Sequence, residues 1–172
     1  IYLAGVNAGL ARLAGECADG FHAHPFHSAE YLKQVVLPAI EQGAAKAGRA
    51  RSDIEVSTTA FVVTNPQEEY FVRSQIAFYA STPSYRPVMA LHGWQTTAEQ
   101  LSALASRGTW GEMPALINDE MLETFAVRAD VGDLPAALAE RYNGLVDRLA
   151  LYIPFVPGER DDLWKVLLSY WR

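Results

Sequence analysis

Cysteine and basic residues are the scarce components of this sequence. Its 172 residues contain one cysteine, Cys17, so no internal disulfide can form. The 14 Lys and Arg residues face 20 Asp and Glu, which gives a formal net charge of −6. Binding to nucleic acid or to anionic lipid needs clustered basic side chains, so this balance argues against both. No apolar run approaches the roughly 20 residues that span a bilayer.

Several recognisable motifs are also missing. There is no Gly-x-Ser-x-Gly, no Walker loop and no Rossmann glycine triplet, and no signal-peptide pattern opens the sequence. With the single cysteine and the acidic charge, this predicts a cytoplasmic protein whose partner is a small molecule or another protein. Residues 1–5 have the pattern of a buried strand without a polar lead-in, so we expect the sequence to start inside a domain.

The sequence itself alternates between strand and helix patterns. Parallel strands joined by right-handed crossovers follow from this order, and an α/β fold is predicted. The four strands could form a small sheet or half of a (β/α)₈ barrel. Strands are expected at 1–5, 21–26, 54–63 and 149–154, helices at 10–17, 29–47, from 66, at 133–142 and at 160–171, and a less regular helical insertion at about 81–130.

Local signals fix several helix ends. Ser28 and Asn65 are predicted N-caps, because their side-chain oxygens can accept from the free N–H groups of the first helical turn. Pro38 should bend the helix that contains it. Cys17 lies on the apolar face of the helix at 10–17, which predicts a buried structural residue.

The turn Gly5-Val6-Asn7-Ala8-Gly9 joins the end of a predicted strand to the start of a helix. Free backbone N–H groups and the positive end of the helix dipole favour a phosphate there, and small side chains permit its close approach. A tight connection that binds nothing would have the same pattern, so spacing alone leaves both interpretations open.

Three histidines, His22, His24 and His27, form the only histidine cluster. Such spacing could bind zinc, but metal sites usually add a ligand on a facing element, and no Cys or His elsewhere in the sequence has an obvious pairing with the cluster. No metal site is therefore predicted. His24 instead follows the second strand, and strand carboxyl ends supply the active site in barrels of this class. We therefore expect His24 to face a cofactor pocket.

Aromatic residues surround the start of the predicted insertion. Tyr85 and Arg86 are the candidates for substrate binding, with Arg86 suited to an anionic substrate or cofactor tail. An aromatic helix face packed on the barrel or on a partner subunit is the alternative, and it is favoured for Trp94 and Trp110.

Residues 4–20, Ala-Gly-Val-Asn-Ala-Gly-Leu-Ala-Arg-Leu-Ala-Gly-Glu-Cys-Ala-Asp-Gly, resemble the luciferase-like monooxygenase superfamily. The Leu-Ala-Gly-Val-Asn turn and the His-Pro-Phe at 24–26 are most similar to its coenzyme F420-dependent branch, and residues 116–125 and 130–151 match more loosely. The resemblance implies that the four strands are strands 5 to 8 of a TIM barrel. The chain would be a C-terminal half with a helical insertion before its last strand.

The same resemblance implies a function. It suggests an F420-dependent oxidoreductase that transfers a hydride to or from a small organic substrate, with an FMN-dependent monooxygenase as the alternative. Gly5, Val6, Asn7 and Gly9, together with His24, would bind the cofactor, and the family's acid and base residues would lie on strands absent from this sequence. A hypothesis of another class is a non-catalytic half-barrel that forms a homo-oligomer or pairs with a missing N-terminal half, because its strand edges need a cover.

Overall fold

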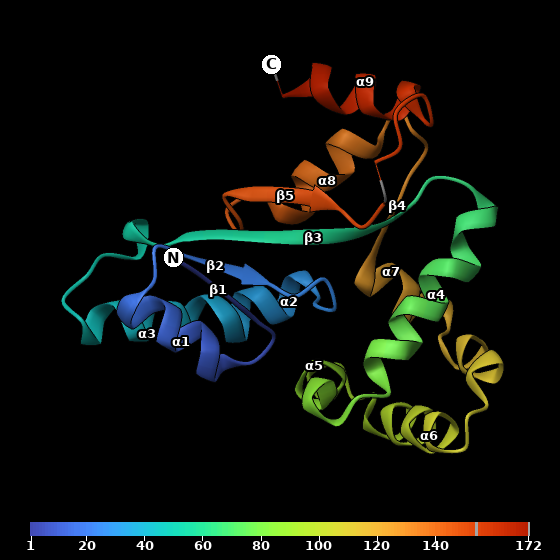
Figure 1. Cartoon of the computed structure of the whole chain (residues 1–172), viewed down its shortest axis with the longest axis horizontal. Coiled ribbons are helices and arrows are strands. Elements are labelled where there is room, and N and C mark those ends of the chain that lie inside the picture. The colour runs from blue at the N-terminus through green and yellow to red at the C-terminus, as the bar shows by residue number, and fades with distance from the viewer. Residues whose placement is uncertain (154, 172) are drawn as a thin grey trace.

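A computed structural model describes residues 1–153 and 155–171 of the chain. Its centre is a parallel sheet in which β3 is the long middle strand (Figure 1). β1 pairs with β2 and β2 pairs with β3, while β5 and β4 pair with successive segments of β3. The strands are β1 (Tyr2–Gly5), β2 (Gly20–Ala23), β3 (Glu55–Val63), β4 (Ala126–Arg128) and β5 (Arg148–Leu151).

Helices connect the strands and gather in three groups. In Figure 1, α1 and α3 lie beside β1 and β2, α8 and α9 lie beyond β5, and α4 to α7 gather past the carboxyl end of β3. No helix in the described ranges is long and apolar enough to cross a membrane. The helices are α1 (Ala8–Cys17), α2 (Ala29–Tyr31), α3 (Leu37–Lys46), α4 (Pro66–Ala80), α5 (Arg86–Leu91), α6 (Gln95–Ser106), α7 (Asp119–Phe125), α8 (Leu134–Tyr142) and α9 (Asp161–Tyr170), with 3₁₀ turns at Arg51–Asp53, Pro83–Tyr85 and Trp110–Leu116.

The predicted alternation of strands and helices is confirmed, but the sheet has one strand more than expected. β4 lies inside the segment 81–130 that the sequence assigns to a helical insertion. Its partner β3 is longer than β2 or β5, and Phe61 to Val63 are the residues that β4 pairs with. A three-residue strand is too short for its side-chain alternation to be read from the sequence.

Two strands end earlier than predicted. β2 stops at Ala23 instead of residue 26, because Pro25 has no N–H to donate and the Phe26 N–H donates to Nδ1 of His24 at 3.1 Å. The last strand, expected over 149–154, ends at Leu151. Pro154, which belongs to that prediction, lies outside the described residues.

The helix expected at 29–47 is interrupted by a π-helical segment, Leu32–Val36. The N–H of Leu37 donates to the carbonyl of Leu32, five residues earlier. Pro38 follows at once and cannot donate to the carbonyl of Gln34, so the wider turn lies where the ordinary helical bond would be lost. The predicted bend at Pro38 stays a prediction, and the structure shows this π-helical segment directly before it. The predicted N-cap Ser28 is confirmed, because its hydroxyl accepts from the Tyr31 N–H at 3.0 Å.

The two faces of the sheet have different environments. Phe21 and Val56, which are in register on β2 and β3, lie under the helices and are fully buried. On the opposite face Tyr2 is 51% exposed, and Nε of Arg148 lies 2.8 Å from Oε1 of Glu55. Helices therefore cover one side of this sheet, and the other side carries polar and charged side chains.

Helix α1 packs against α3 through its small residues, and this overturns the prediction for Cys17. Ala11, Ala14 and Gly15 are the buried residues of α1, whereas Cys17 is exposed. An ideal Cβ built on Gly15 would lie 2.2 Å from the Ile40 carbonyl oxygen of α3. Because the backbones of α1 and α3 approach so closely, the small-residue face of α1 is the buried one. The face with the larger apolar side chains Leu10 and Leu13 is exposed to solvent.

We expect Gly43→Ala to destabilise the fold by about 2 to 3 kcal/mol, the upper range for overpacking a tight contact. A Cβ at Gly43 would lie 1.9 Å from the backbone oxygen of Arg12, and a backbone atom cannot move aside as a side chain can. Urea unfolding followed by circular dichroism measures the change. Gly9→Ala, on α1 with nothing within 4 Å of its Cβ, is the matched control and should not lose stability.

Candidate functional site

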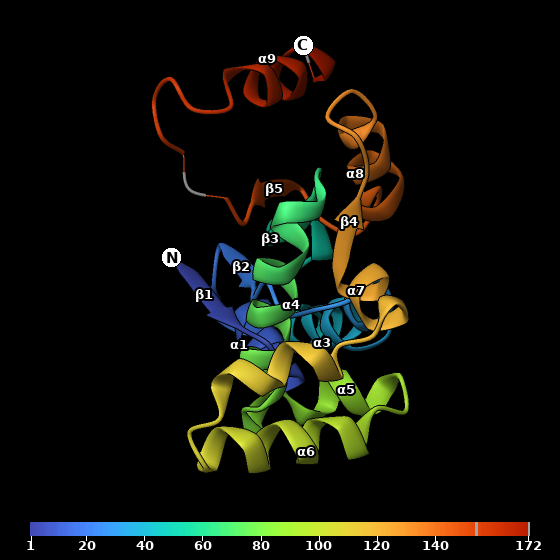
Figure 2. The ribbon, with the colours of Figure 1, turned by 90° about the vertical axis from the view of Figure 1, so that its right-hand side faces the viewer.

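The candidate residues meet at the carboxyl ends of the strands. Gly5 ends β1, His24 directly follows β2, and the His24 N–H donates to the Gly5 carbonyl at 2.9 Å. Parallel strands present all their carboxyl ends at one edge of the sheet, and this edge carries the active site in barrels and open α/β sheets. Helix α4 begins at the same end of β3 and lies in front of it in Figure 2. The 3₁₀ turn Pro83–Tyr85 follows the other end of α4.

The amino end of α1 has no side-chain cap, unlike those of α2, α4 and α7. The amino ends of α3, α5, α6, α8 and α9 also have none. Asn65 caps α4 by accepting from the Glu68 N–H at 3.2 Å, as predicted, and Asn118 caps α7 in the same way. Asn7 is in the N-cap position of α1 but makes no such bond. The backbone N–H groups of the first turn of α1 are therefore available to an anion.

The side chain of Asn7 is used elsewhere. Its Nδ2 donates to the Ser84 carbonyl at 2.8 Å, and its Oδ1 accepts from the Tyr31 hydroxyl at 3.2 Å. One carboxamide thus joins the turn after β1, the helical segment after β2 and the 3₁₀ turn that contains Ser84. Of the other predicted residues in this turn, Val6 is buried and offers a ligand only its backbone, and Gly9 is exposed with open space around its Cα.

His24 lies in a group that we call the aromatic cluster, formed with Tyr79, Tyr85 and Tyr152. Its ring centroid is 4.6 Å from Tyr79, nearly perpendicular, and 4.8 Å from Tyr85. Nε2 of His24 is 3.3 Å from the Tyr85 hydroxyl, and the Tyr79 and Tyr152 hydroxyls are 2.9 Å apart. Burial lowers the pKa of His24 to about 4, with a smaller effect of His22, so its imidazole is neutral at pH 7.

The structure brings the predicted cofactor and substrate residues together. Ser84, which Asn7 holds, directly precedes Tyr85, and Tyr85 contacts His24. Arg86 is different: it begins α5, is exposed, and makes no ion pair or side-chain hydrogen bond within residues 1–153 and 155–171.

Tyr152 is a residue of the cluster that the sequence analysis missed, together with Gln75, whose Oε1 accepts from the Tyr152 hydroxyl at 3.3 Å. A signal was available for Tyr152, because it is the first residue after β5 and so lies at the carboxyl edge. Gln75 gave none, since a glutamine in the middle of a helix has no distinctive pattern.

The three histidines do not converge on one point. Nδ1 of His22 is bonded to Ser57 Oγ at 2.9 Å, and Nδ1 of His27 to the His24 carbonyl at 2.7 Å. Among the described residues, no three side chains of His, Cys, Asp or Glu are gathered as a metal site would require.

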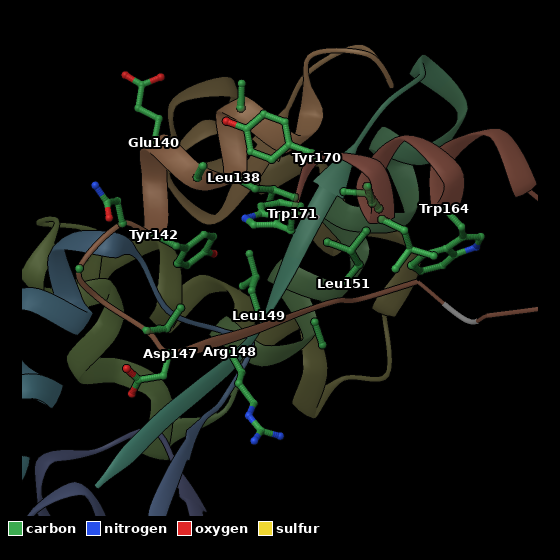
Figure 3. Close-up of a pocket in the computed structure, with 18 residues that line it drawn as sticks. Leu138, Glu140, Tyr142, Asp147, Arg148, Leu149, Leu151, Trp164, Tyr170 and Trp171 are labelled. Atoms are coloured by element: carbon green, nitrogen blue, oxygen red, sulfur yellow. The ribbon is translucent and has the colours of Figure 1, made fainter. Parts of the chain in front are cut away.

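A cavity of about 1110 Å³ lies away from the aromatic cluster, between α8, β5 and α9 (Figure 3). Leu149 and Leu151 point into it from β5, whereas Arg148 points away. Leu138 of α8 and Trp164 of α9 complete its apolar walls. This is the helix-covered side of the sheet, so the cavity is a gap between packing layers and is separate from the candidate site.

Fold and site together define the class of protein: an α/β protein with a parallel sheet and its candidate residues at the carboxyl edge. The family model of luciferase-like monooxygenases matches residues 1–151, and the chain belongs to this family of oxidoreductases. The resemblance found in residues 4–20 is thereby confirmed.

Relatives with sequence similarity are longer than this chain. The uncharacterized protein Rv1360 of Mycobacterium tuberculosis is 41% identical over 155 residues, which cover 87% of this chain and 46% of the relative. A 5,10-methylenetetrahydromethanopterin reductase of Methanopyrus kandleri is 25% identical over 157 residues, covering 90% and 44%. The chain spans about half the length of the curated relatives it matches.

Solved structures show the same fold. The coenzyme F420-dependent tetrahydromethanopterin reductase of Methanopyrus kandleri aligns with a TM-score of 0.74 at 22% identity, covering 98% of this chain and 48% of the other. An F420-dependent secondary alcohol dehydrogenase in complex with an F420-acetone adduct aligns with a TM-score of 0.57 at 17% identity, covering 87% and 42%. The sheet of this chain thus corresponds to about half of each of these larger chains.

His27 is the buried titratable group beneath the site. It is 3% exposed, its Nδ1 is bonded to the His24 carbonyl, and its Nε2 has no hydrogen-bond partner among the described residues. Burial lowers the pKa of His27 to about 4, although the bond to the His24 carbonyl opposes this shift.

We expect this histidine to make the fold sensitive to acid. The unfolded chain binds its proton near pH 6.5 and the folded chain only near pH 4, so stability falls as the pH drops through this window. Between pH 7 and pH 5 the free energy of unfolding should lose about 2 kcal/mol from this group. Urea unfolding at both pH values should show that His27→Asn, which retains a donor at the Nδ1 position, loses less stability than the unaltered chain.

An equal loss of stability in both proteins would contradict the prediction. If His27→Asn is too unstable to measure, an NMR titration of the His27 imidazole gives the same information. Its ring should stay neutral down to pH 5.

Proposed function

We propose that this chain binds coenzyme F420 at its carboxyl edge and that the protein transfers a hydride between this deazaflavin and a small organic substrate. The observation that carries the proposal is the uncapped amino end of α1 beside the aromatic cluster. When bound, the deazaflavin ring supplies the hydride chemistry. The phosphate would be held by the backbone of Gly5, Val6, Asn7 and Gly9.

The residues present fit such a ligand in two respects. The first-turn N–H groups of α1 suit a phosphate, and the open space at Gly9 lets it approach the backbone. The neutral imidazole of His24 and the tyrosine rings suit ring contacts with a planar aromatic system. Arg86, exposed at the rim, remains a candidate for an anionic substrate or cofactor tail.

The relatives support the deazaflavin over FMN. Two of the solved structures with this fold, the reductase and the alcohol dehydrogenase, are described as F420-dependent. An FMN-dependent monooxygenase remains the alternative, since the family is named for monooxygenases. We assign no catalytic acid or base to this chain.

Titration of the 172-residue chain into F420 should quench the deazaflavin emission, and FMN should bind more weakly. Gly9→Asp adds a negative charge in the first turn of α1, and we expect it to raise the dissociation constant for F420 at least ten-fold. The same charge is favourable to the helix dipole, so stability should rise slightly while binding falls. If Gly9→Asp lost binding because it unfolds the chain, affinity for F420 and stability would both fall.

Gly9→Asn is the matched control, since it has nearly the same size and no charge. It should retain most of the affinity for F420. Tight FMN binding without quenching of F420 would contradict the deazaflavin assignment, and equal effects of Asp and Asn would contradict a phosphate at this helix end.

The free edges of the sheet support a proposal about partners. β1 pairs only with β2 and β5 only with β3 in the described sheet, so each has an unpaired edge. Leu10 and Leu13 on α1, next to β1, are 45% and 44% exposed. We propose that these surfaces are covered by a second copy of the chain or by residues corresponding to the other half of the relatives' length. Unpaired edges and exposed apolar faces are otherwise prone to association.

Sedimentation velocity of the chain at micromolar concentration tests this proposal. We expect association, and we expect Leu13→Lys to reduce it because a charge replaces part of the apolar face. A monomer with a cooperative thermal transition would contradict the proposal. Leu145→Lys, which exchanges a partly buried leucine in the connection between α8 and β5, controls for general loss of stability.

A further inference from the structure

We propose that the hydroxyl of Tyr85 donates a hydrogen bond to the oxygen of an uncharged carbonyl or alcohol substrate, and that His24 is the positioning residue that orients it. This inference rests on the proposed function, because it names the substrate class of the same site. It follows from the direction of the hydrogen bonds in the aromatic cluster.

The proton of His24 has one available position. The Phe26 N–H donates to Nδ1 of His24 at 3.1 Å, so Nδ1 carries a lone pair and the ring proton is on Nε2. Nε2 lies 3.3 Å from the Tyr85 hydroxyl oxygen and therefore donates to it. Because the hydroxyl accepts from His24, its own proton points to another acceptor.

The other two tyrosine hydroxyls have no proton to offer. Tyr152 donates to Oε1 of Gln75 at 3.3 Å, so its oxygen is the acceptor in the 2.9 Å bond with Tyr79. The Tyr79 proton is thus used within the cluster. Burial, and next the bond with Tyr152, raise the pKa of Tyr79, so it stays protonated. Tyr85 is the cluster tyrosine whose proton has no acceptor among the described residues.

The position of Tyr85 is fixed on two sides. Ser84, its neighbour in the chain, is held by Asn7 Nδ2 at 2.8 Å. The Tyr85 ring lies 4.8 Å from His24 and 5.9 Å from Phe26, centroid to centroid. A hydroxyl held in this way loses little rotational entropy when it binds a ligand.

The chemistry of the cluster selects an uncharged oxygen. Within the described part of the chain its hydrogen bonds run among His24, the tyrosines, Gln75 and the backbone, and no ionised side chain takes part. Among the described residues, the adjacent Arg86 makes no side-chain hydrogen bond or ion pair with these groups, and it is exposed. A carboxylate would lose its hydration here without a cation in return, whereas a ketone, an aldehyde or a secondary alcohol needs only one donor.

Three probes of similar shape separate these possibilities: cyclohexanone, methylenecyclohexane, which lacks the oxygen, and cyclohexanecarboxylate. Saturation-transfer NMR on the 172-residue chain, with and without F420, gives their relative affinities. We expect cyclohexanone to bind at least ten-fold more tightly than methylenecyclohexane, and Tyr85→Phe to remove this preference. Tyr70→Phe, the same change at a tyrosine that is 65% exposed on α4, should preserve it.

The role of His24 as a hydrogen-bond donor to Tyr85 is tested by comparing a substitution that can replace this donor with one that cannot. His24→Gln can place an amide N–H where Nε2–H lies and should retain part of the ketone preference, while His24→Leu should lose it. Circular dichroism spectra and thermal transitions of all variants verify folding. A role of His24 in packing alone would make the two variants equal.

The outcomes separate the two proposals. If F420 binds equally to the unaltered chain and to Tyr85→Phe but both lack a ketone preference, the inference on Tyr85 is wrong and the proposed function stands. If F420 binds to neither and the ketone preference still depends on Tyr85, the proposed cofactor is wrong and the hydrogen-bond donor stands. Tightest binding of cyclohexanecarboxylate would overturn the substrate class.

Discussion

The carboxamide of Asn7 is the contact on which the geometry of this site depends. A cap on α1 would contribute about 1 kcal/mol, and the side chain instead makes two hydrogen bonds, to Tyr31 and to the Ser84 carbonyl, each of a similar net value. Replacing the cap by these two hydrogen bonds therefore changes the free energy of unfolding little. It leaves the first-turn N–H groups of α1 uncapped and holds the turn that carries Tyr85 against the carboxyl edge of the sheet.

The uneven cover of the sheet explains several exposed residues. Phe21 and Val56 are buried under helices, while the opposite face carries the bonded pair His22 and Ser57 and the charged side chain of Arg148. Parallel sheets are normally covered on both sides. In a (β/α)₈ barrel the helices form only the outer layer. The described helices likewise cover one side of this sheet, and the polar groups on the other side bond to one another across the strands.

The sequence predicted those features of the structure that depend on neighbouring residues, and it missed those that depend on residues far away in the chain. The caps at Ser28 and Asn65 are set by a few neighbouring residues, and these two predictions are confirmed. β4 and the exposure of Cys17 depend on distant partners, β3 in one case and the backbone of α3 in the other. The candidate site shows the same division: the resemblance indicated Asn7 and His24, but the bond that joins Asn7 to Ser84 spans 77 residues.

The residues that would recognise a ligand in the aromatic cluster are uncharged, and they are only partly shielded from water. The aromatic cluster is uncharged, so it selects ligands by hydrogen bonding and by ring contacts, both of which strengthen as water is excluded. Its members Tyr79, Tyr85 and Tyr152 are only partly buried in this chain. A cover over the free sheet edges, as proposed above, would leave unaltered which groups of this chain recognise the ligand. In that proposal the selectivity comes from residues of this chain, and a cover that excludes water from the cluster would add to the affinity.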